Sequence, residues 1–138
     1  MSAEKIKIDA LVKASPDKVY QLWTEPEHII NWNFASDDWC CPRAENELWV
    51  GGNYKTRMEA KDGSFGFDFE GVYEEVSPSE KLAYSMPDGR KVQITFEEET
   101  GSTRVTTQFD PEAQNSIKMQ RDGWQAILDN FKKYAETH

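Results

Sequence analysis

Cysteine and histidine are scarce in this sequence. Its 138 residues include two cysteines, which are neighbours at Cys40 and Cys41, and two histidines, His28 and His138. Neighbouring Cα atoms are about 3.8 Å apart, whereas relaxed disulfides join Cα atoms roughly 4.4–6.8 Å apart. The pair therefore cannot form an ordinary disulfide or cross-link distant segments. Because zinc-ligand spacings, a Ser-His-Asp order and nucleotide-binding fingerprints are all missing, we expect no metal site, no cofactor and no catalytic residue.

Long apolar runs and an excess of positive charge are also missing. No stretch approaches the roughly 18 apolar residues of a membrane-spanning helix, and the N-terminal sequence MSAEKIKIDALVKAS lacks the apolar core of a signal peptide. Asp and Glu outnumber Lys and Arg by 25 to 16, a net charge of −9. Phosphate backbones and anionic lipids attract basic patches, so we expect neither nucleic acid nor membrane as a partner. Reduced cysteines without a leader favour a cytoplasmic protein.

A single domain spanning residues 1–138 is expected, because a chain of this length buries roughly 70% of its unfolded surface and shows no repeat or linker. Residues 5–12 alternate between apolar and polar side chains, which predicts a half-buried strand. Ser15-Pro16-Asp17 has the pattern of a helix start. Glu25-Pro26-Glu27 then interrupts the helix. Two short helices are therefore predicted after the first strand.

Alternation resumes after Gly51-Gly52 and continues through segments at residues 53–60, 65–76, 82–86, 90–96 and 105–109, separated by turn signals such as Asp62-Gly63. From about residue 115 to residue 136 the apolar spacing becomes helical, giving a rod about 33 Å long. Strands in a run followed by one helix predict an α+β fold. We expect a curved antiparallel sheet of about six or seven strands wrapped around the long C-terminal helix.

The stretch NWNFASDDWCCP, residues 31–42, is predicted to be a loop that joins the second short helix to the next strand. Trp32 is expected to close the helix, Trp39 to lean on a pocket, and Cys40 to lie at the pocket mouth. Charged Asp37 and Asp38 nearby would raise the pKa of a thiol. Buried, inert cysteines are therefore favoured over a redox site.

Several segments in this order resemble one known family. They are TEPEHIINW (24–32), VGGNYKTRM (50–58), GVYEEVSPSEKLAYS (71–85), VQITFEEE with STRVTTQF (92–99 and 102–109), and GWQAILDNFKKY (123–134). The chain resembles the START-like, SRPBCC superfamily, and within it the family related to the C-terminal domain of the heat-shock protein 90 ATPase activator, over about residues 5–136. This resemblance implies the helix-grip fold. The chain differs from many members of this family just before Gly51-Gly52: they have an Arg-Pro pair where this sequence has Trp49-Val50.

A cavity between the curved sheet and the last helix is the expected ligand site. Strand parity and the loop assignment give its predicted lining: Trp32, Trp39, Cys40, Tyr54, Thr56, Met58, Phe67, Phe69, Tyr73, Tyr84, Arg90, Val92 and Trp124. An aromatic inner face with few ionisable groups favours a binding protein for a small hydrophobic or amphipathic molecule.

Two other functions stay open from the residues alone. The same cavity could serve an enzyme of the polyketide cyclase or hydrolase type, in which Glu75, Arg90, His28 or a cysteine supplies acid–base groups. The resemblance alone also suggests a stress-related protein or co-chaperone with a chaperone partner. A homodimer is left open as well.

Overall fold

The computed structural model describes residues 5–138, and its seven strands form one antiparallel sheet. The strand order across the sheet is β1-β7-β6-β5-β4-β3-β2. Strands that pair are therefore consecutive in sequence, except for β1 and β7. The strands are β1 (Ile6–Val12), β2 (Trp39–Asn46), β3 (Asn53–Ala60), β4 (Gly66–Ser77), β5 (Lys81–Ser85), β6 (Lys91–Glu99) and β7 (Ser102–Phe109).

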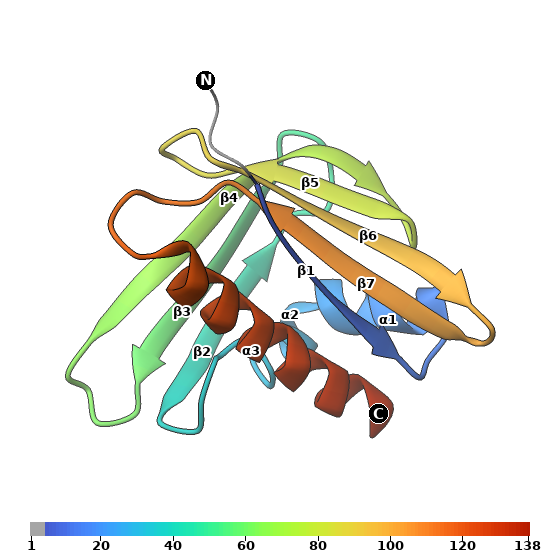
Figure 1. The fold of residues 1–138 in the computed structure, drawn as a ribbon, viewed down its shortest axis with the longest axis horizontal. Coiled ribbons are helices and arrows are strands. Elements are labelled where there is room, and N and C mark those ends of the chain that lie inside the picture. The colour runs from blue at the N-terminus through green and yellow to red at the C-terminus, as the bar shows by residue number, and fades with distance from the viewer. Residues whose placement is uncertain (1–4) are drawn as a thin grey trace.

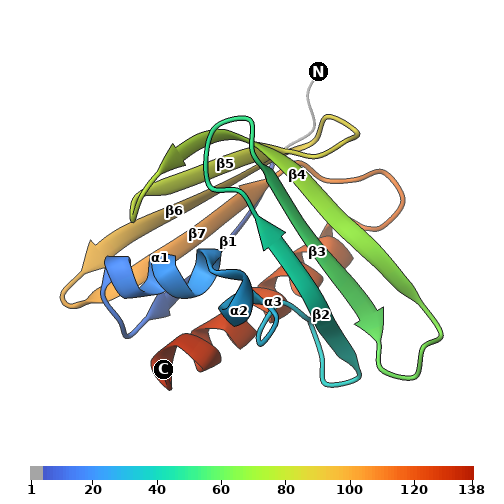
Figure 2. The same ribbon diagram turned by 180° about the vertical axis from the view of Figure 1, so that it is seen from behind.

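Three helices complete the α+β architecture: α1 (Pro16–Thr24), α2 (Pro26–Ile29) and α3 (Ile117–Glu136). The sheet curls into a half-barrel, α3 runs across its concave side, α1 lies near β6 and β7, and α2 lies near β2 (Figures 1 and 2). This arrangement confirms the predicted helix-grip fold, including the two short helices after the first strand.

Local sequence explains where the helices begin. The Ser15 side chain accepts a hydrogen bond from the Lys18 N–H at 3.3 Å, and Pro16 occupies the first helical position, where a missing N–H costs nothing. Pro26 restarts the chain as α2 after Glu25 adopts an extended conformation. Ser116 caps α3 by accepting from the Met119 N–H at 3.1 Å.

The sheet core follows the predicted alternation. β1 alternates between buried and exposed residues along its whole length, and β7 between buried and half-buried ones. The concave face of the sheet packs on Leu128, Phe131 and Ala135, which form the inner stripe of α3. None of the helices within residues 5–138 combines the length and apolarity that a bilayer-spanning segment needs.

The predicted loop over residues 31–42 is wrong at its C-terminal end, because β2 already begins at Trp39. Pro42 obscured this strand, since proline has no N–H for a sheet ladder. β2 accommodates it by being an edge strand and by shifting register between Cys40 and Arg43, where Pro42 needs no ladder partner. The edge strand β2 (Trp39–Asn46) therefore precedes the first strand that the alternation after the loop predicts, at residues 53–60.

Candidate ligand cavity

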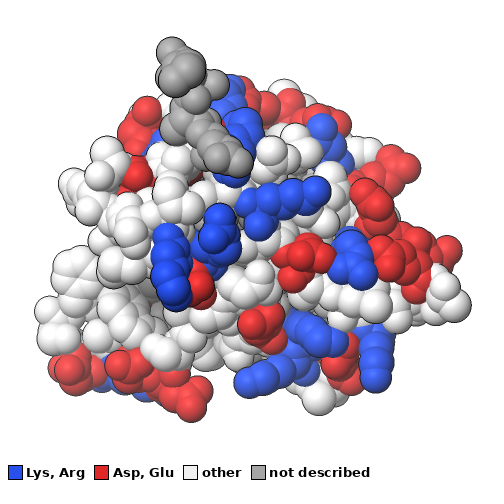
Figure 3. All heavy atoms as spheres, in the orientation of Figure 1, with Lys and Arg blue, Asp and Glu red and all other residues white. Residues whose placement is uncertain are grey.

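A cavity of about 520 Å³ lies between the concave face of the sheet and the first half of α3. It is lined by α3, by Trp32 and Asn33 from the α2–β2 connection, and by residues of every strand except β2. Cavities of roughly 300–1,000 Å³ are typical of small-molecule sites. In Figure 3 the surface over β3 and β4 is largely uncharged above an acidic lower rim, and a recess separates it from α3.

Seven aromatic residues contribute to the cavity lining. Trp124 stacks on Phe109 with ring centres 3.9 Å apart, and Phe69 meets Trp124 edge-on at 5.9 Å. Tyr54 on β3 and Tyr84 on β5 contact each other across β4, with ring centres 5.4 Å apart. Such contacts fix the rings, so the cavity is a preformed space with an apolar surface.

Burial controls the protonation of the two cavity tyrosines. Desolvation raises the pKa of Tyr54 and of Tyr84 far above the usual phenol range. Both hydroxyls therefore stay neutral under ordinary conditions. They can donate a hydrogen bond to a ligand but cannot act as phenolate bases.

Charged and polar groups gather at the cavity mouth. Arg90 is held by Asp88, whose carboxylate accepts from Arg90 Nε at 2.7 Å and from the Arg90 N–H at 3.1 Å. Both hydrogen bonds lower the pKa of Asp88, and the one from the main-chain N–H of Arg90 has the larger effect. Glu112 accepts from the Asn115 N–H and Nδ2 at 2.8 and 2.6 Å. The arginine is thus neutralised locally, while the hydrogen bonds that the Glu112 carboxylate accepts within residues 5–138 come from the neutral groups of Asn115.

Nine of the thirteen residues predicted from the sequence line this cavity. They are Trp32, Tyr54, Met58, Phe67, Phe69, Tyr84, Arg90, Val92 and Trp124. The structure brings them together from α3, the α2–β2 connection, four strands and the β5–β6 turn. Their contact with a ligand stays a prediction.

The other four predicted residues, Trp39, Cys40, Thr56 and Tyr73, lie outside the lining. Trp39 packs at the far end of the sheet against Phe65 and Phe67, with ring centres about 6.0 and 6.1 Å away. Cys40 is opposite Glu59, whose position alternates with cavity-lining Met58, so the register places it on the outer face.

Thr56 and Tyr73 share the inner face but lie beneath the lining. Thr56 is completely buried, and within residues 5–138 its Oγ1 has no hydrogen-bond partner. The Tyr73 hydroxyl donates to Asn46 Oδ1 at 2.6 Å and so is turned toward β2. The alternation of residues along a strand predicts which face of the sheet a side chain is on. Whether that side chain reaches the cavity also depends on the curvature of the sheet, which the alternation does not predict.

Sequence reasoning missed several lining residues on α3. Met119, Gly123 and Ile127 follow one another at four-residue spacing and form a stripe along the cavity roof. That spacing was readable in the sequence. Met119 is 63% exposed and Gly123 has no side chain, so neither carries the signature of a core position.

The segment before β2 forms a wall rather than a lid. Trp32 is buried, and its Nε1 donates to the Leu22 carbonyl at 3.1 Å. Asn130 on α3 donates from Nδ2 to the Trp32 carbonyl at 2.8 Å. Residues 34–37 follow along the outer side of α3, next to Ala126 and Lys133, away from the cavity mouth.

The remaining acid–base candidates lie away from the cavity. Glu75 pairs with Lys81 at 3.2 Å, and His28 contacts Tyr134. The Cys41 thiol is buried and donates to the Arg43 carbonyl at 3.4 Å, and its burial raises its pKa. Of the groups proposed for catalysis, only Arg90 reaches the lining.

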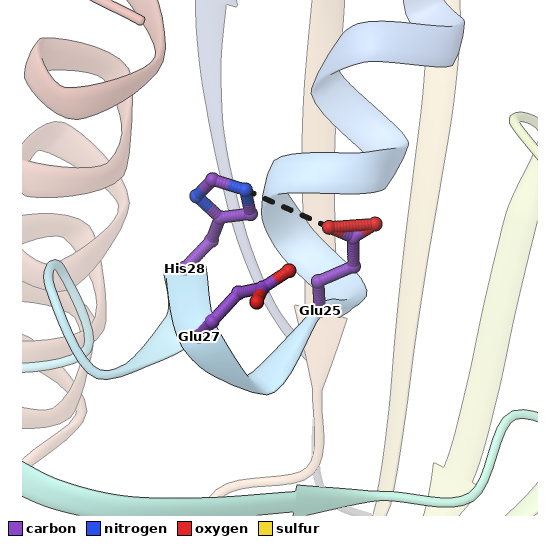
Figure 4. Close-up of side chains that lie close together, drawn as sticks. All are labelled: Glu25, Glu27 and His28. Atoms are coloured by element: carbon purple, nitrogen blue, oxygen red, sulfur yellow. Dashed lines mark ion pairs between the residues drawn. The ribbon is translucent and has the colours of Figure 1, made fainter.

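One group of side chains within residues 5–138 has the composition of a metal site: Glu25, Glu27 and His28, whose ligand atoms lie within 4.8 Å of one another (Figure 4). His28 Nε2 is 3.6 Å from Glu25 Oε1. Its Nδ1 is 2.7 Å from the Tyr134 hydroxyl, an outer contact of the kind that orients a ligating imidazole. The group is half-exposed at the α1–α2 junction and lies outside the cavity lining.

Comparison with known proteins identifies relatives over nearly the whole chain. The sequence profile of the family described as activator of Hsp90 ATPase homolog 1-like protein matches residues 13–136. The solution structure of the AHSA1-like protein from Aeromonas hydrophila is 42% identical with a TM-score of 0.91, covering 97% of this chain and 93% of that one.

Two further structures extend the comparison. A Cytophaga hutchinsonii protein is 45% identical with a TM-score of 0.83, covering 96% of this chain and 92% of its own. A Chromobacterium violaceum protein at 21% identity shares the fold, with a TM-score of 0.87 and coverage of 97% and 99%. No curated protein matches the sequence.

Proposed function

This chain belongs to the family of activator of Hsp90 ATPase homolog 1-like proteins, and from that membership and the cavity we propose that it binds one small hydrophobic or amphipathic molecule between the sheet and α3. The cavity volume of about 520 Å³ suits such a ligand. Its aromatic walls would supply the apolar contact, and the polar groups at the mouth would orient the ligand.

The observation that carries this proposal is Gly123, a glycine in the interior of α3 that faces the cavity. Glycine destabilises a helix interior by about 1 kcal/mol relative to alanine. A Cβ added at Gly123 would meet no atom within 4 Å, so close packing does not require glycine there. Gly123 therefore lowers helix stability without being needed for packing. A glycine at this position leaves space in the cavity that a ligand could occupy.

Binding is favoured over catalysis because the lining is poor in acid–base groups. The cavity tyrosines have strongly raised pKa values, and Arg90 is engaged by Asp88. None of these groups is a base near neutral pH. A cyclase or hydrolase reaction would need Glu112 or another mouth carboxylate to act alone.

Two substitutions of Gly123 test the proposal. Titration with the neutral fluorophore N-phenylnaphthylamine should show saturable one-site binding to the wild-type protein. Gly123→Phe should abolish this binding by filling the cavity. Gly123→Ala should keep it and raise the free energy of unfolding by about 0.5–1 kcal/mol. Undiminished binding to a folded Gly123→Phe variant would place the probe elsewhere and contradict the proposal.

Contact with a heat-shock chaperone is a second candidate function, drawn from the family description. The observation that favours it is an exposed apolar pair between β2 and β3: Trp49 is 59% exposed and Val50 65% exposed. Such a pair could pack against a partner protein. A pull-down with the bacterial homologue of that chaperone, together with its ATPase assay, should depend on Trp49. Absence of both binding and ATPase stimulation would end this candidate.

A further inference from the structure

We propose that the unpaired main-chain edge of β4 recognises the polar end of the cavity ligand, and that this ligand is a neutral molecule joining an apolar ring body to a secondary amide. This inference rests on the proposed function, because it assigns a ligand class to the same cavity. The edge consists of the N–H and C=O groups of Asp68 and Glu70, residues that border the cavity mouth.

The ladder between β3 and β4 shows which way these groups point. Ala60 donates to the Phe65 carbonyl at 2.9 Å, and Tyr73 donates to the Gly52 carbonyl at 2.9 Å. Paired residues in an antiparallel ladder alternate between bonded and non-bonded pairs. In this register the odd-numbered residues of β4 bond to β3. The N–H and C=O of Asp68 and Glu70 must then point away from β3.

Among the strands that the structure describes, none pairs with that side of β4 between Gly66 and Gly71. Pairing with β5 begins only at Val72, so the segment from Gly66 to Gly71 has β3 as its single neighbour. Within residues 5–138, no hydrogen bond reaches the main-chain N–H or C=O of Asp68 or Glu70. Two donors and two acceptors therefore lie side by side at the entrance to an aromatic cavity.

The outer edge of the sheet at β1 is treated differently. There, Gln125 Nε2 on α3 donates to the Asp9 carbonyl at 3.2 Å, and Lys132 Nζ donates to the Leu11 carbonyl at 2.7 Å. Covering an edge in this way is how folded proteins prevent unwanted pairing. The same helix covers one edge with its side chains. On the cavity side, the same helix contributes Met119 and Gly123 to the lining, and neither has a polar side-chain group that could bond to the β4 edge.

Charge at the mouth selects a neutral ligand group. The side chains of Asp68 and Glu70 lie on the outer face, 3.6 Å from Arg57 and Lys55 respectively. Of the charged residues in the cavity lining, Asp68, Glu70 and Glu112 are acidic, whereas Arg90 is basic and already bonded to Asp88. A ligand carboxylate would therefore meet more acidic than basic groups in the lining. An amide matches the edge in both respects, because it carries one donor and one acceptor at the spacing of a peptide group.

Three related probes test the inference without changing the protein: the N-methyl amide, the methyl ester and the free carboxylate of naphthoic acid. The amide and the ester have nearly the same shape, but only the amide can donate to a β4 carbonyl. One net hydrogen bond corresponds to roughly three- to tenfold in Kd. Calorimetric titration should therefore give an amide Kd about three- to tenfold below that of the ester, with the carboxylate weakest.

A proline substitution then localises the effect. Glu70→Pro removes an N–H that faces away from β3, a position where an edge strand tolerates proline. This variant should bind both the amide and the ester about three- to tenfold more weakly than the wild-type protein does, because the carbonyl of either probe loses the Glu70 N–H as its donor. The matched control Glu70→Ala also loses the ion pair with Lys55 but keeps the N–H, so it should bind both probes as tightly as the wild-type protein does. Because the wild-type comparison needs no variant, a Glu70→Pro protein that fails to fold leaves the test intact.

The outcomes separate this inference from the proposed function. Equal binding of amide and ester, both blocked by Gly123→Phe, would overturn the role of the β4 edge while leaving the cavity as a ligand site. Tightest binding of the carboxylate would overturn the neutral ligand class. Absence of binding by all three probes would overturn the inference. N-phenylnaphthylamine binding would then decide separately whether the cavity takes ligands at all.

Discussion

At the scale of single residues, Thr56 is the clearest case of a polar group without a partner. It is fully buried on β3, and its Oγ1 is left without a hydrogen bond among the residues that the structure describes. An unsatisfied buried hydroxyl costs about 1–3 kcal/mol. Thr56→Val keeps the shape and the strand preference of the side chain. It should raise the free energy of unfolding in urea by about 1 kcal/mol; a loss of stability would mean that the hydroxyl has a partner in solution.

Gly71 on β4 is required by close packing rather than by backbone conformation. A Cβ there would overlap the Tyr84 ring, with Cδ2 the nearest atom and Cε2 only 3.0 Å away. Gly71→Ala should therefore destabilise the protein by about 1–3 kcal/mol and push Tyr84 into the cavity, which weakens probe binding.

Gly66→Ala on the same strand is the matched control for this prediction. The Cβ there would meet the far end of the flexible Arg57 side chain, which can move aside. Urea unfolding and probe titration of both variants give the comparison. Equal losses of stability in the two variants would show that Tyr84 is not the cause.

The sequence predicts the position of a cavity residue where the local alternation of apolar and polar side chains is enough to place it. Strand parity placed Tyr54, Phe69 and Val92 on the inner face, where they line the cavity. It also placed Thr56 there, although Thr56 lies below the lining. The register shift beside Pro42 sent Cys40 to the outer face. Neither the alternation along a strand nor the composition of the chain predicts the curvature of the sheet or the position of a bulge.

At the scale of elements, Gln120 clamps the β7–α3 connection to the helix. Its Nε2 donates to the carbonyls of Glu112 and Asn115 at 3.1 and 2.8 Å, and its Oε1 accepts from the Glu112 N–H at 2.8 Å. Gln120→Met keeps the volume but leaves three main-chain groups without their partner. It should lower the free energy of unfolding by about 1–3 kcal/mol.

The same substitution should also change the cavity mouth, because Glu112 and Asn115 border it. Faster hydrogen exchange of the Glu112 and Asn115 amides would confirm the clamp. Unchanged exchange and stability would show that the connection is held by other contacts.

Asp110 ties the sheet together at the end of β7. Its carboxylate accepts from Lys5 Nζ at 2.6 Å and from the Lys91 N–H at 2.9 Å, and the Lys5 hydrogen bond is the main reason that its pKa is lowered. A pKa below the unfolded value of about 3.9 means that the folded state favours the charged form. The stabilisation is therefore present above that value and is lost as the pH falls through the folded-state pKa.

Asp110→Asn should accordingly cost about 0.5–1 kcal/mol near neutral pH, a modest amount because Lys5 is well exposed. The difference from wild type should shrink toward zero as the solution is acidified. Urea unfolding across a pH series measures this. A difference that stays constant down to acid pH would show that ionisation of Asp110 is not its source.

At the scale of the whole molecule, element order was predictable because each element carries its own signal. The period-two pattern of residues 6–12 and the helical pattern of residues 117–136 are both visible without structure. The cavity is different, since its volume results from the curl of seven strands and from the angle of α3 over them. The free edge of β4 likewise exists because β5 is shorter than β4, with five residues against twelve.

The central claim is that a small apolar molecule occupies the space beneath α3. The most direct test is to measure intermolecular nuclear Overhauser effects between the bound N-methyl amide of naphthoic acid and isotope-labelled protein. Contacts from the naphthalene protons to Phe69, Val92 and Trp124 are the predicted result, with the amide methyl near the β4 edge. Contacts confined to the exposed side chains of Trp49, Val50 and Phe65 would contradict the claim.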